Sequence, residues 1–238
     1  MVKKNKYAQV KKLHYLVILS FKKNANSTRA IEQQRYMKST LPFYGLPSPV
    51  IKKIVNEQLI NFPISDNQLY RKLIQYFFSQ AKKREEWHAG LHIALKYKNF
   101  ITETNLNLYL NLVLKTQWWD IVDAVAINLV GEAIHSSTNF KQLLNLWIKH
   151  KNMWVRRTAI LCQLKYKLST NEDLLYRMIL NCADEKEFFI RKAIGWALRE
   201  YSKTNPRSVK HFIKKNSSKL SPLSIREGMK RMKLQSVC

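Results

Sequence analysis

Residues 186–201 read KEFFIRKAIGWALREY, and this stretch shows the pattern that decides the fold. Its apolar side chains recur every three to four residues, which places them on one stripe of an α-helix. That stripe consists of Ile190, Ile194, Ala197, Leu198 and Tyr201. A half-buried strand would instead alternate apolar and polar side chains at every second position. We therefore predict a helix with one buried face.

The same spacing of apolar residues recurs along the rest of the chain. Further helices are predicted at residues 67–82, 85–97, 105–115, 119–134, 140–150, 154–164 and 172–183. Polar groups with cap or turn chemistry separate them, at residues 65–66, 136–138, 169–171 and 204–206. The sharpest break is LPFYGLPSP at residues 41–49, where three prolines are expected to end one helix. Ser48 is expected to cap the next helix, with Pro49 in its first turn.

Short helices joined by brief loops predict an all-α protein built from antiparallel helix pairs of about 40 residues. Stacked side by side, such pairs form a HEAT-like solenoid, expected here as a right-handed-type superhelix with a basic concave face. We expect a single repeat domain over residues 1–238. Within it, residues 1–24 form a basic N-terminal helix and residues 25–238 form the solenoid.

The charge of the chain indicates a polyanionic partner. Lys and Arg number 42 against 16 Asp and Glu, which gives a formal net charge of +26. This exceeds what solubility requires, and the charge is spread along the whole chain instead of forming a tail. DNA, RNA and an acidic membrane surface all remain open on charge alone. A basic concave face would follow phosphates by releasing counterions.

Targeting and redox signals are weak. Basic residues precede the apolar run Leu13–Phe21 and loosely resemble a secretory signal, but His14 interrupts the run and lysines follow it. We interpret the segment as an ordinary basic first helix. No apolar run reaches the roughly 18 residues of a membrane span. The odd cysteine count (Cys162, Cys182 and Cys238) argues against a disulfide framework and favours a cytoplasmic, nucleoid-associated protein.

Metal and cofactor chemistry has little support. His88 and His92 lie four residues apart, a spacing compatible with a metal site, but the HAGLH sequence lacks the glutamate of a metalloprotease. The chain has no Gly-rich phosphate loop and no GxSxG elbow. We therefore expect neither a metal nor a cofactor.

Two segments pair unusual side chains. Trp119 and Asp123 lie one helical turn apart, so an indole can shield the carboxylate and offer a π face to a cation. Alternatively, Trp119 belongs to the core, and Asp120 or Asp123 forms a cap or a salt bridge. Arg156 and Arg157 are adjacent on a predicted helix and cannot face the same way. One could enter a groove while the other stays in solvent, or both could be solvated.

A third segment surrounds Trp196, which lies off the apolar stripe. Lys192 lies four residues before it and Arg199 three residues after it, so cations flank the indole. Gly195 leaves room for a close approach. Aromatic surface interleaved with basic groups is typical of nucleic-acid binding. A partly buried structural tryptophan is the alternative.

Taken together, these segments resemble the AlkD family of alkylpurine DNA glycosylases. The resemblance covers about Arg35 to Met232 and rests on several stretches of sequence. They are RYMK at 35–38, WWD with VD at 118–123, RTAIL and QLKYK at 157–167, KEFFI to LREY at 186–201, KTNP at 203–206, and residues 223–227.

The resemblance implies a role for each matching position. Asp123 would be the catalytic carboxylate, with Trp119 and Trp196 as the two active-site tryptophans. Arg157 would hold the DNA backbone near the lesion, and Tyr36 would be a supporting contact. Beside these, Lys192, Arg199 and Arg156 are expected to bind DNA.

The implied activity is excision of cationic alkylated purines from duplex DNA in base excision repair. Expected substrates are 3-methyladenine, 7-methylguanine and bulky N3 or N7 adducts, and the family does not need to flip the base. The expected partner is double-stranded DNA that contains alkylated bases, bound by a monomer and not at a membrane. The alternatives are a non-catalytic HEAT-like binder of damaged or branched DNA and an RNA- or ribosome-associated scaffold.

Overall fold

The computed structural model describes residues 2–135, 137 and 140–232. All the regular secondary structure of these residues is helical, which confirms the all-α class. Cys238 and parts of the expected break at 136–138 lie outside the described residues. None of the helices in the described ranges is long and apolar enough to cross a bilayer.

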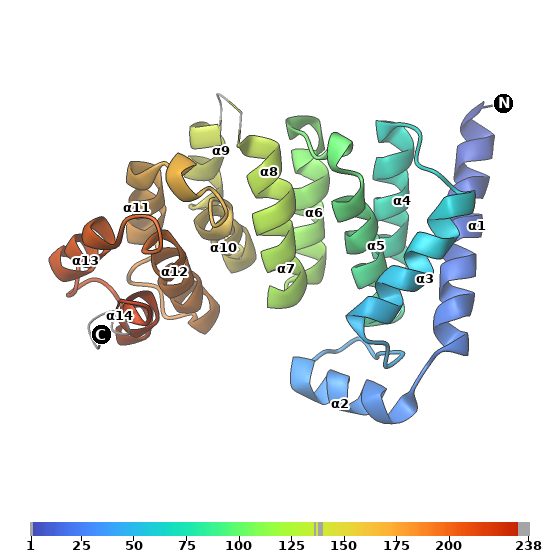
Figure 1. Cartoon of the computed structure of the whole chain (residues 1–238), viewed down its shortest axis with the longest axis horizontal. Helices are drawn as coiled ribbons and strands as arrows, with labels where there is room; N and C mark the ends of the chain where they lie inside the picture. Colours follow the sequence, from blue (N-terminus) through green and yellow to red (C-terminus); the bar gives the residue numbers. More distant parts are fainter. Residues whose placement is uncertain (1, 136, 138–139, 233–238) are drawn as a thin grey trace. The chain divides into compact units, whose positions relative to one another are not determined.

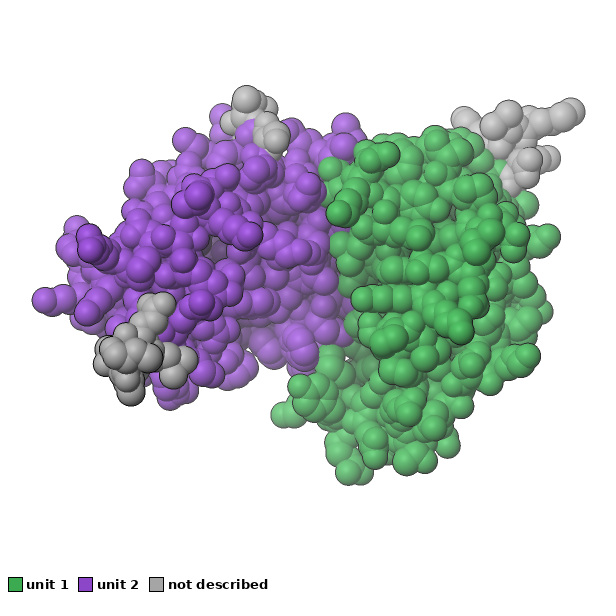
Figure 2. Space-filling view, viewed as in Figure 1, with its two compact units in different colours: residues 1–101 green, residues 102–238 purple. Residues whose placement is uncertain are grey.

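The chain divides into two compact units, residues 1–101 and 102–238 (Figure 2). Unit 1 holds α1 (Val2–Lys23), α2 (Ser27–Met37), α3 (Ser48–Asn61), α4 (Asn67–Gln80), α5 (Arg84–Lys96) and η1 (Lys98–Phe100). Unit 2 holds η2 (Glu103–Asn105), α6 (Leu106–Thr116), α7 (Trp119–Val125), η3 (Ala126–Val130), α8 (Gly131–Ile134), α9 (Phe140–Trp147), α10 (Met153–Leu161), η4 (Lys167–Ser169), α11 (Glu172–Asn181), α12 (Phe188–Tyr201), α13 (Pro206–Lys215) and α14 (Pro222–Met229). A single domain with a superhelical twist and a concave face stays a prediction.

Helix pairing organises unit 1. Helices α4 and α5 pack against each other, and α1 packs on both α3 and α4 (Figure 1). The turn between α4 and α5 is short, so the indole N–H of Trp87 reaches the carbonyl of Phe78 at 3.3 Å. Gly90 lets α5 approach closely, because a Cβ there would lie 2.9 Å from the Phe77 and Phe78 side chains. Burial of these apolar faces supplies most of the favourable free energy of folding.

A buried carboxylate fixes the proline-rich turn before α3. Glu85 accepts hydrogen bonds from the backbone N–H groups of Tyr44, Gly45 and Leu46 at 2.8–3.1 Å. Gly45 has a φ of +85°, which suits glycine, and an added Cβ would lie 2.0 Å from the carbonyl oxygen of Asn26. Through Glu85, helix α5 therefore fixes the conformation of the turn at residues 44–46, which has no regular secondary structure.

The expected helix starts are largely confirmed. Asp66, Asn171 and Asn205 each cap the next helix by accepting a backbone N–H bond. The expectation for Ser48 was wrong, because it is the first helical residue of α3 and makes no side-chain cap bond. Pro47 takes the cap position instead, in an extended conformation that the preceding turn imposes.

Unit 2 contains a long helix with a local change of winding. The predicted helix at 119–134 is present, but residues 126–130 (η3) are wound as a π-helix between α7 and α8. Such insertions are rare and are frequently found at functional sites. Helix α10 packs against α6, α7 and α12, and α14 packs closely on α12. Three helices that carry candidate site residues (α7, α10 and α12) therefore meet in one unit.

Candidate active site

An ion pair between α7 and α10 lies at the centre of the candidate site. Arg157 donates from Nε to Asp123 Oδ1 at 2.7 Å and from Nη2 to Asp123 Oδ2 at 2.8 Å. Two parallel bonds of this kind are the strongest and most directional form of an arginine–carboxylate pair. The sequence placed both residues in the site, and the structure joins them directly.

The pair is largely withdrawn from solvent. The Asp123 side chain is 13% exposed and the Arg157 side chain is 5% exposed. Burial raises the pKa of Asp123 above its ordinary value, while the hydrogen bonds and charge of Arg157 oppose the rise. A buried carboxylate without its arginine would carry a large desolvation penalty. The Asp123 carboxylate therefore lies in a largely buried setting, where the charge and hydrogen bonds of Arg157 favour its ionised form.

An aromatic cluster supports this pair. The ring of Phe189 lies 5.4 Å from that of Trp118 and 4.9 Å from that of Trp154, measured between centroids. Arg157 Nη1 donates to the backbone carbonyl of Phe189, and the guanidinium carbon lies 5.9 Å from that ring. The cluster therefore connects the start of α12 to the Asp123 pair on α7 and α10.

The two candidate active-site tryptophans occupy different helices of unit 2. Trp119 is the first residue of α7, one turn before Asp123, and its side chain is half-buried. Trp196 is also half-buried and lies seven residues after Phe189 on α12. Seven residues make about two turns, so Trp196 lies on the same face as Phe189, roughly 10 Å further along the helix. Both rings keep accessible surface for a ligand.

Arg156 is held by contacts within unit 2. Its guanidinium donates to both carboxylate oxygens of Glu185 at 2.7 and 2.6 Å. Its Nη1 group donates to the backbone carbonyl oxygens of His150 and Lys151. The expectation that the second arginine stays in solvent is wrong, because the Arg156 side chain is only 14% exposed. Its role in DNA binding stays a prediction.

The cations beside Trp196 share one partner. Lys192 and Arg199 contact the two carboxylate oxygens of Glu227 on α14, at 3.1 and 2.8 Å. Burial alone would raise the pKa of Glu227, but these cations outweigh it and lower that pKa. The close approach expected at Gly195 is made by α14, since Ser224 and Glu227 pack against this glycine. DNA binding by Lys192 and Arg199 stays a prediction.

The contact at Gly195 leads to a prediction about stability. An alanine Cβ would lie 2.5 Å from the Glu227 Cβ and 3.0 Å from the Ser224 carbonyl, so α14 must move. We expect Gly195→Ala to lower the free energy of unfolding by roughly 1–3 kcal/mol, as measured by urea denaturation. Helix propensity alone predicts the opposite sign, a gain of about 1 kcal/mol. A stabilised variant would contradict the packing account.

Tyr36 belongs to unit 1. It lies on α2, and its side chain is 77% exposed. Its expected contact with DNA stays a prediction. No pattern in the sequence predicted a role for Phe189, Glu185 or Glu227. Phe189 lies within the segment that also carries Lys192 and Trp196, Glu185 lies just before that segment, and Glu227 is the last residue of the matched stretch 223–227.

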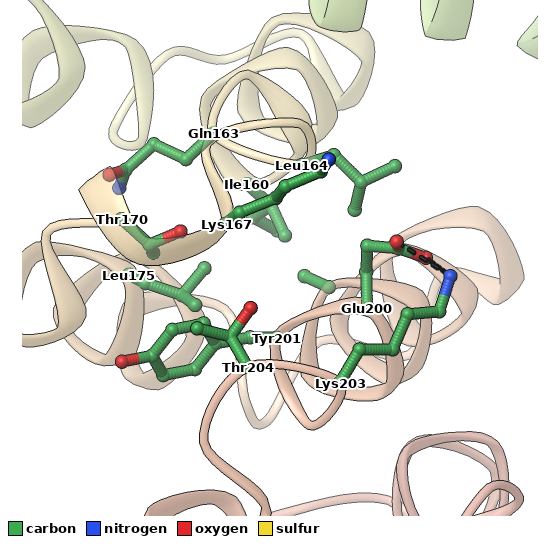
Figure 3. Close-up of a pocket in the computed structure, with 11 residues that line it drawn as sticks. Ile160, Gln163, Leu164, Lys167, Thr170, Leu175, Glu200, Tyr201, Lys203 and Thr204 are labelled. Atoms are coloured by element: carbon green, nitrogen blue, oxygen red, sulfur yellow. Dashed lines mark hydrogen bonds and ion pairs between the residues drawn. The ribbon is translucent and has the colours of Figure 1, made fainter.

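A small pocket of about 270 Å³ lies elsewhere in unit 2, at the C-terminal ends of α10 and α12 (Figure 3). Gln163 and Lys167 line one side, and Tyr201 and Thr204 line another. Lys203 at its rim is paired with Glu200 at 2.6 Å. The pocket contains neither Asp123 nor the two candidate tryptophans, so it is separate from the ion-paired site.

Comparison with known proteins identifies the class to which this helical protein belongs. The family model for "DNA alkylation repair enzyme" matches residues 17–232. A solved structure described as "Predicted DNA alkylation repair enzyme from Enterococcus faecalis" is 32% identical, with a TM-score of 0.77. The match covers 87% of this chain and 95% of that one. No curated protein matches the chain.

The chain therefore belongs to the DNA alkylation repair enzyme family. Membership confirms the family resemblance noted in the sequence and supports a role in the repair of alkylated DNA, with DNA as the partner.

Proposed function

We propose that this protein is a DNA glycosylase that hydrolyses the N-glycosidic bond of cationic alkylated purines in duplex DNA. The observation that carries the proposal is the Asp123 carboxylate, which is largely buried and held by Arg157 one turn from Trp119. The proposed substrates are 3-methyladenine, 7-methylguanine and bulkier N3 or N7 adducts. We propose further that the base is released without being flipped into a pocket.

The chemistry suits a buried anion. A purine alkylated at N3 or N7 already carries positive charge, so no general acid has to protonate the leaving group. Cation-like character builds up on the sugar as the bond breaks, and a fixed carboxylate stabilises it without reorganisation. Asp123 supplies that charge and can also orient the attacking water. Burial strengthens the effect because the local dielectric is low.

The tryptophans add a weaker attraction for cations. An indole face within about 6 Å of a cation contributes roughly 0.5–2 kcal/mol, depending on desolvation. Trp119 and Trp196 are half-buried, so each presents part of its ring to a ligand. We propose that these faces hold the cationic nucleotide beside Asp123.

We propose that the main role of Arg157 is to position the Asp123 carboxylate. Three of its N–H groups are used, two by Asp123 and one by the carbonyl of Phe189. A guanidinium has five N–H donors, so two remain for a phosphate oxygen that reaches the site. We propose that Arg157 orients Asp123 and contacts the backbone with those two donors. Tyr36, Lys192, Arg199 and Arg156 are proposed as DNA contacts on the resemblance and on charge.

The protonation state of Asp123 gives a pH prediction. The carboxylate must be ionised, and burial raises its pKa above the ordinary 3.8. Base release should therefore be constant above this raised pKa and fall as the pH decreases through it. Single-turnover rates, corrected for spontaneous depurination, measure the profile. A corrected rate that rises steadily towards acid would contradict the role of Asp123.

The direct test of the proposal compares release with binding. The protein is incubated with methylated duplex DNA and, separately, with an unmethylated four-way junction. Free alkylpurine above the spontaneous level supports the glycosylase. Tight binding of either DNA, with no base released from the methylated duplex, would instead indicate a binder of damaged or branched DNA.

A further inference from the structure

Helix α1 presents a continuous basic face to solvent. Four of its apolar side chains (Val10, Leu13, Val17 and Phe21) are at most 1% exposed, and α1 packs against α3 and α4. The opposite side of the helix carries the exposed residues. We call it the α1 basic face, and it consists of Tyr7, Lys11, Lys12, Tyr15, Leu19, Lys22 and Lys23.

The charge of this face is of one sign and is not neutralised. Helix α1 contains no acidic residue. Lys6 is paired with Asp66, but the four lysines of the face make no ion pair with any residue that the structure describes. A face that serves only to keep an end helix soluble usually mixes charges of both signs. Four like charges along one side instead favour an anionic partner.

The aromatic side chains add a second, independent feature. Tyr15 is 63% exposed and Leu19 is 51% exposed, and Lys11 lies over the Tyr7 ring at 4.7 Å. Tyrosine hydroxyls are regular donors to phosphate oxygens, and their rings cover surface at low entropic cost. Solvent-exposed tyrosines alternating with lysines are therefore typical of a contact surface for nucleic acid.

The composition of the face argues against a membrane. A helix that lies in a bilayer interface needs a broad apolar face directed at the lipid. In α1 the broad apolar face is buried within unit 1, and among the described side chains of the helix Leu19 is the large aliphatic residue that is exposed. The charge fits phosphates better, and the family already supplies DNA as the partner.

We propose that the α1 basic face binds the phosphate backbone of duplex DNA, as a contact separate from the candidate active site in unit 2. Lys11 and Lys22 are eleven helical steps apart, about 16 Å along a helix, which corresponds to roughly five base pairs of duplex. The family match begins at residue 17, so Tyr7, Lys11, Lys12 and Tyr15 lie outside it. The part of the face before residue 17 is thus not a feature of the family model, and the face as a whole is proposed to strengthen DNA binding without entering the chemistry.

The test neutralises the face and measures salt dependence. In one variant, Lys11, Lys12, Lys22 and Lys23 are each changed to Gln. In the control, four other exposed lysines of unit 1 are changed to Gln, namely Lys52, Lys53, Lys96 and Lys98. Both variants lose the same charge. The affinity for unmodified duplex is measured over a series of salt concentrations, with circular dichroism as a check on folding.

Each phosphate contact contributes about 0.9 to the slope of log affinity against log salt. For the α1 variant, we expect the magnitude of this slope to decrease by roughly two to four. Its affinity for the duplex should be weaker by roughly tenfold or more at physiological salt. The slope of the control variant should decrease clearly less. Equal losses in both variants, or an unchanged slope in the α1 variant, would overturn the proposal. So would loss of binding to phosphatidylserine vesicles with the duplex slope retained.

The outcome is independent of the proposed enzymatic activity. With the duplex saturated, the α1 variant should release alkylated base at the wild-type single-turnover rate, because the face does not touch the reacting nucleotide. If the wild type releases no base, the glycosylase proposal fails, and the salt slopes still decide whether α1 binds duplex DNA.

Discussion

Asp123→Asn is expected to slow single-turnover base release by at least roughly 100-fold, the usual effect of removing a charge-stabilising group from an active site. Asparagine has nearly the same size as aspartate but has no charge. It can keep one hydrogen bond to Arg157 while it loses the attraction for a developing cation. We expect the affinity for duplex DNA to change little, because Asp123 is a negative group that does not attract phosphates.

The matched control for this substitution is Asp173→Asn. Asp173 lies in the first turn of α11 in the same unit, is exposed, and undergoes the same change of charge. Its variant should release base at the wild-type rate. If the two variants behave alike, the charge of Asp123 has no special role, and the assignment of the site fails.

Glu85→Ala is expected to be strongly destabilising to unit 1. The variant leaves the N–H groups of Tyr44, Gly45 and Leu46 without their acceptor in a buried turn. Losing hydrogen bonds to a charged group, with buried donors left unpaired, should lower the free energy of unfolding by roughly 3 kcal/mol or more. Urea denaturation followed by tryptophan fluorescence measures the change, since the buried Trp87 lies two residues further along α5.

Glu57 provides the control for this prediction. It is exposed on α3, so Glu57→Ala should change the free energy of unfolding by about 0.5 kcal/mol or less. A shift for Glu85→Ala as small as that of the control would show that the turn does not depend on the carboxylate.

The helices were predictable because their signal is local. Spacing of apolar residues placed α4, α5, α6, α10, α11 and α12 within a few residues of their observed bounds. Caps such as Asp66 and Asn205 could be predicted because the side chain accepts a hydrogen bond from the backbone N–H three residues further along. Ser48 failed because the cap position was decided by the extended turn before it, which Glu85 holds from another helix.

The site was only partly predictable, because its pairings join distant positions. Trp119 and Asp123 could be placed on one face from their spacing. The partner of Asp123 is 34 residues away, and the partners of Arg156 and Arg199 are 29 and 28 residues away. No periodicity indicates such pairings. From the sequence, these arginines were therefore expected to contact solvent or DNA. In the structure, each of these arginines forms an ion pair with a buried or partly buried carboxylate.

The most direct test of the central claim is chromatographic measurement of free alkylpurine released from methylated duplex DNA by the wild-type protein. We expect 3-methyladenine or 7-methylguanine to accumulate well above the spontaneous level, leaving abasic sites in the duplex. Tight binding of the methylated duplex with base release no faster than in buffer would contradict it.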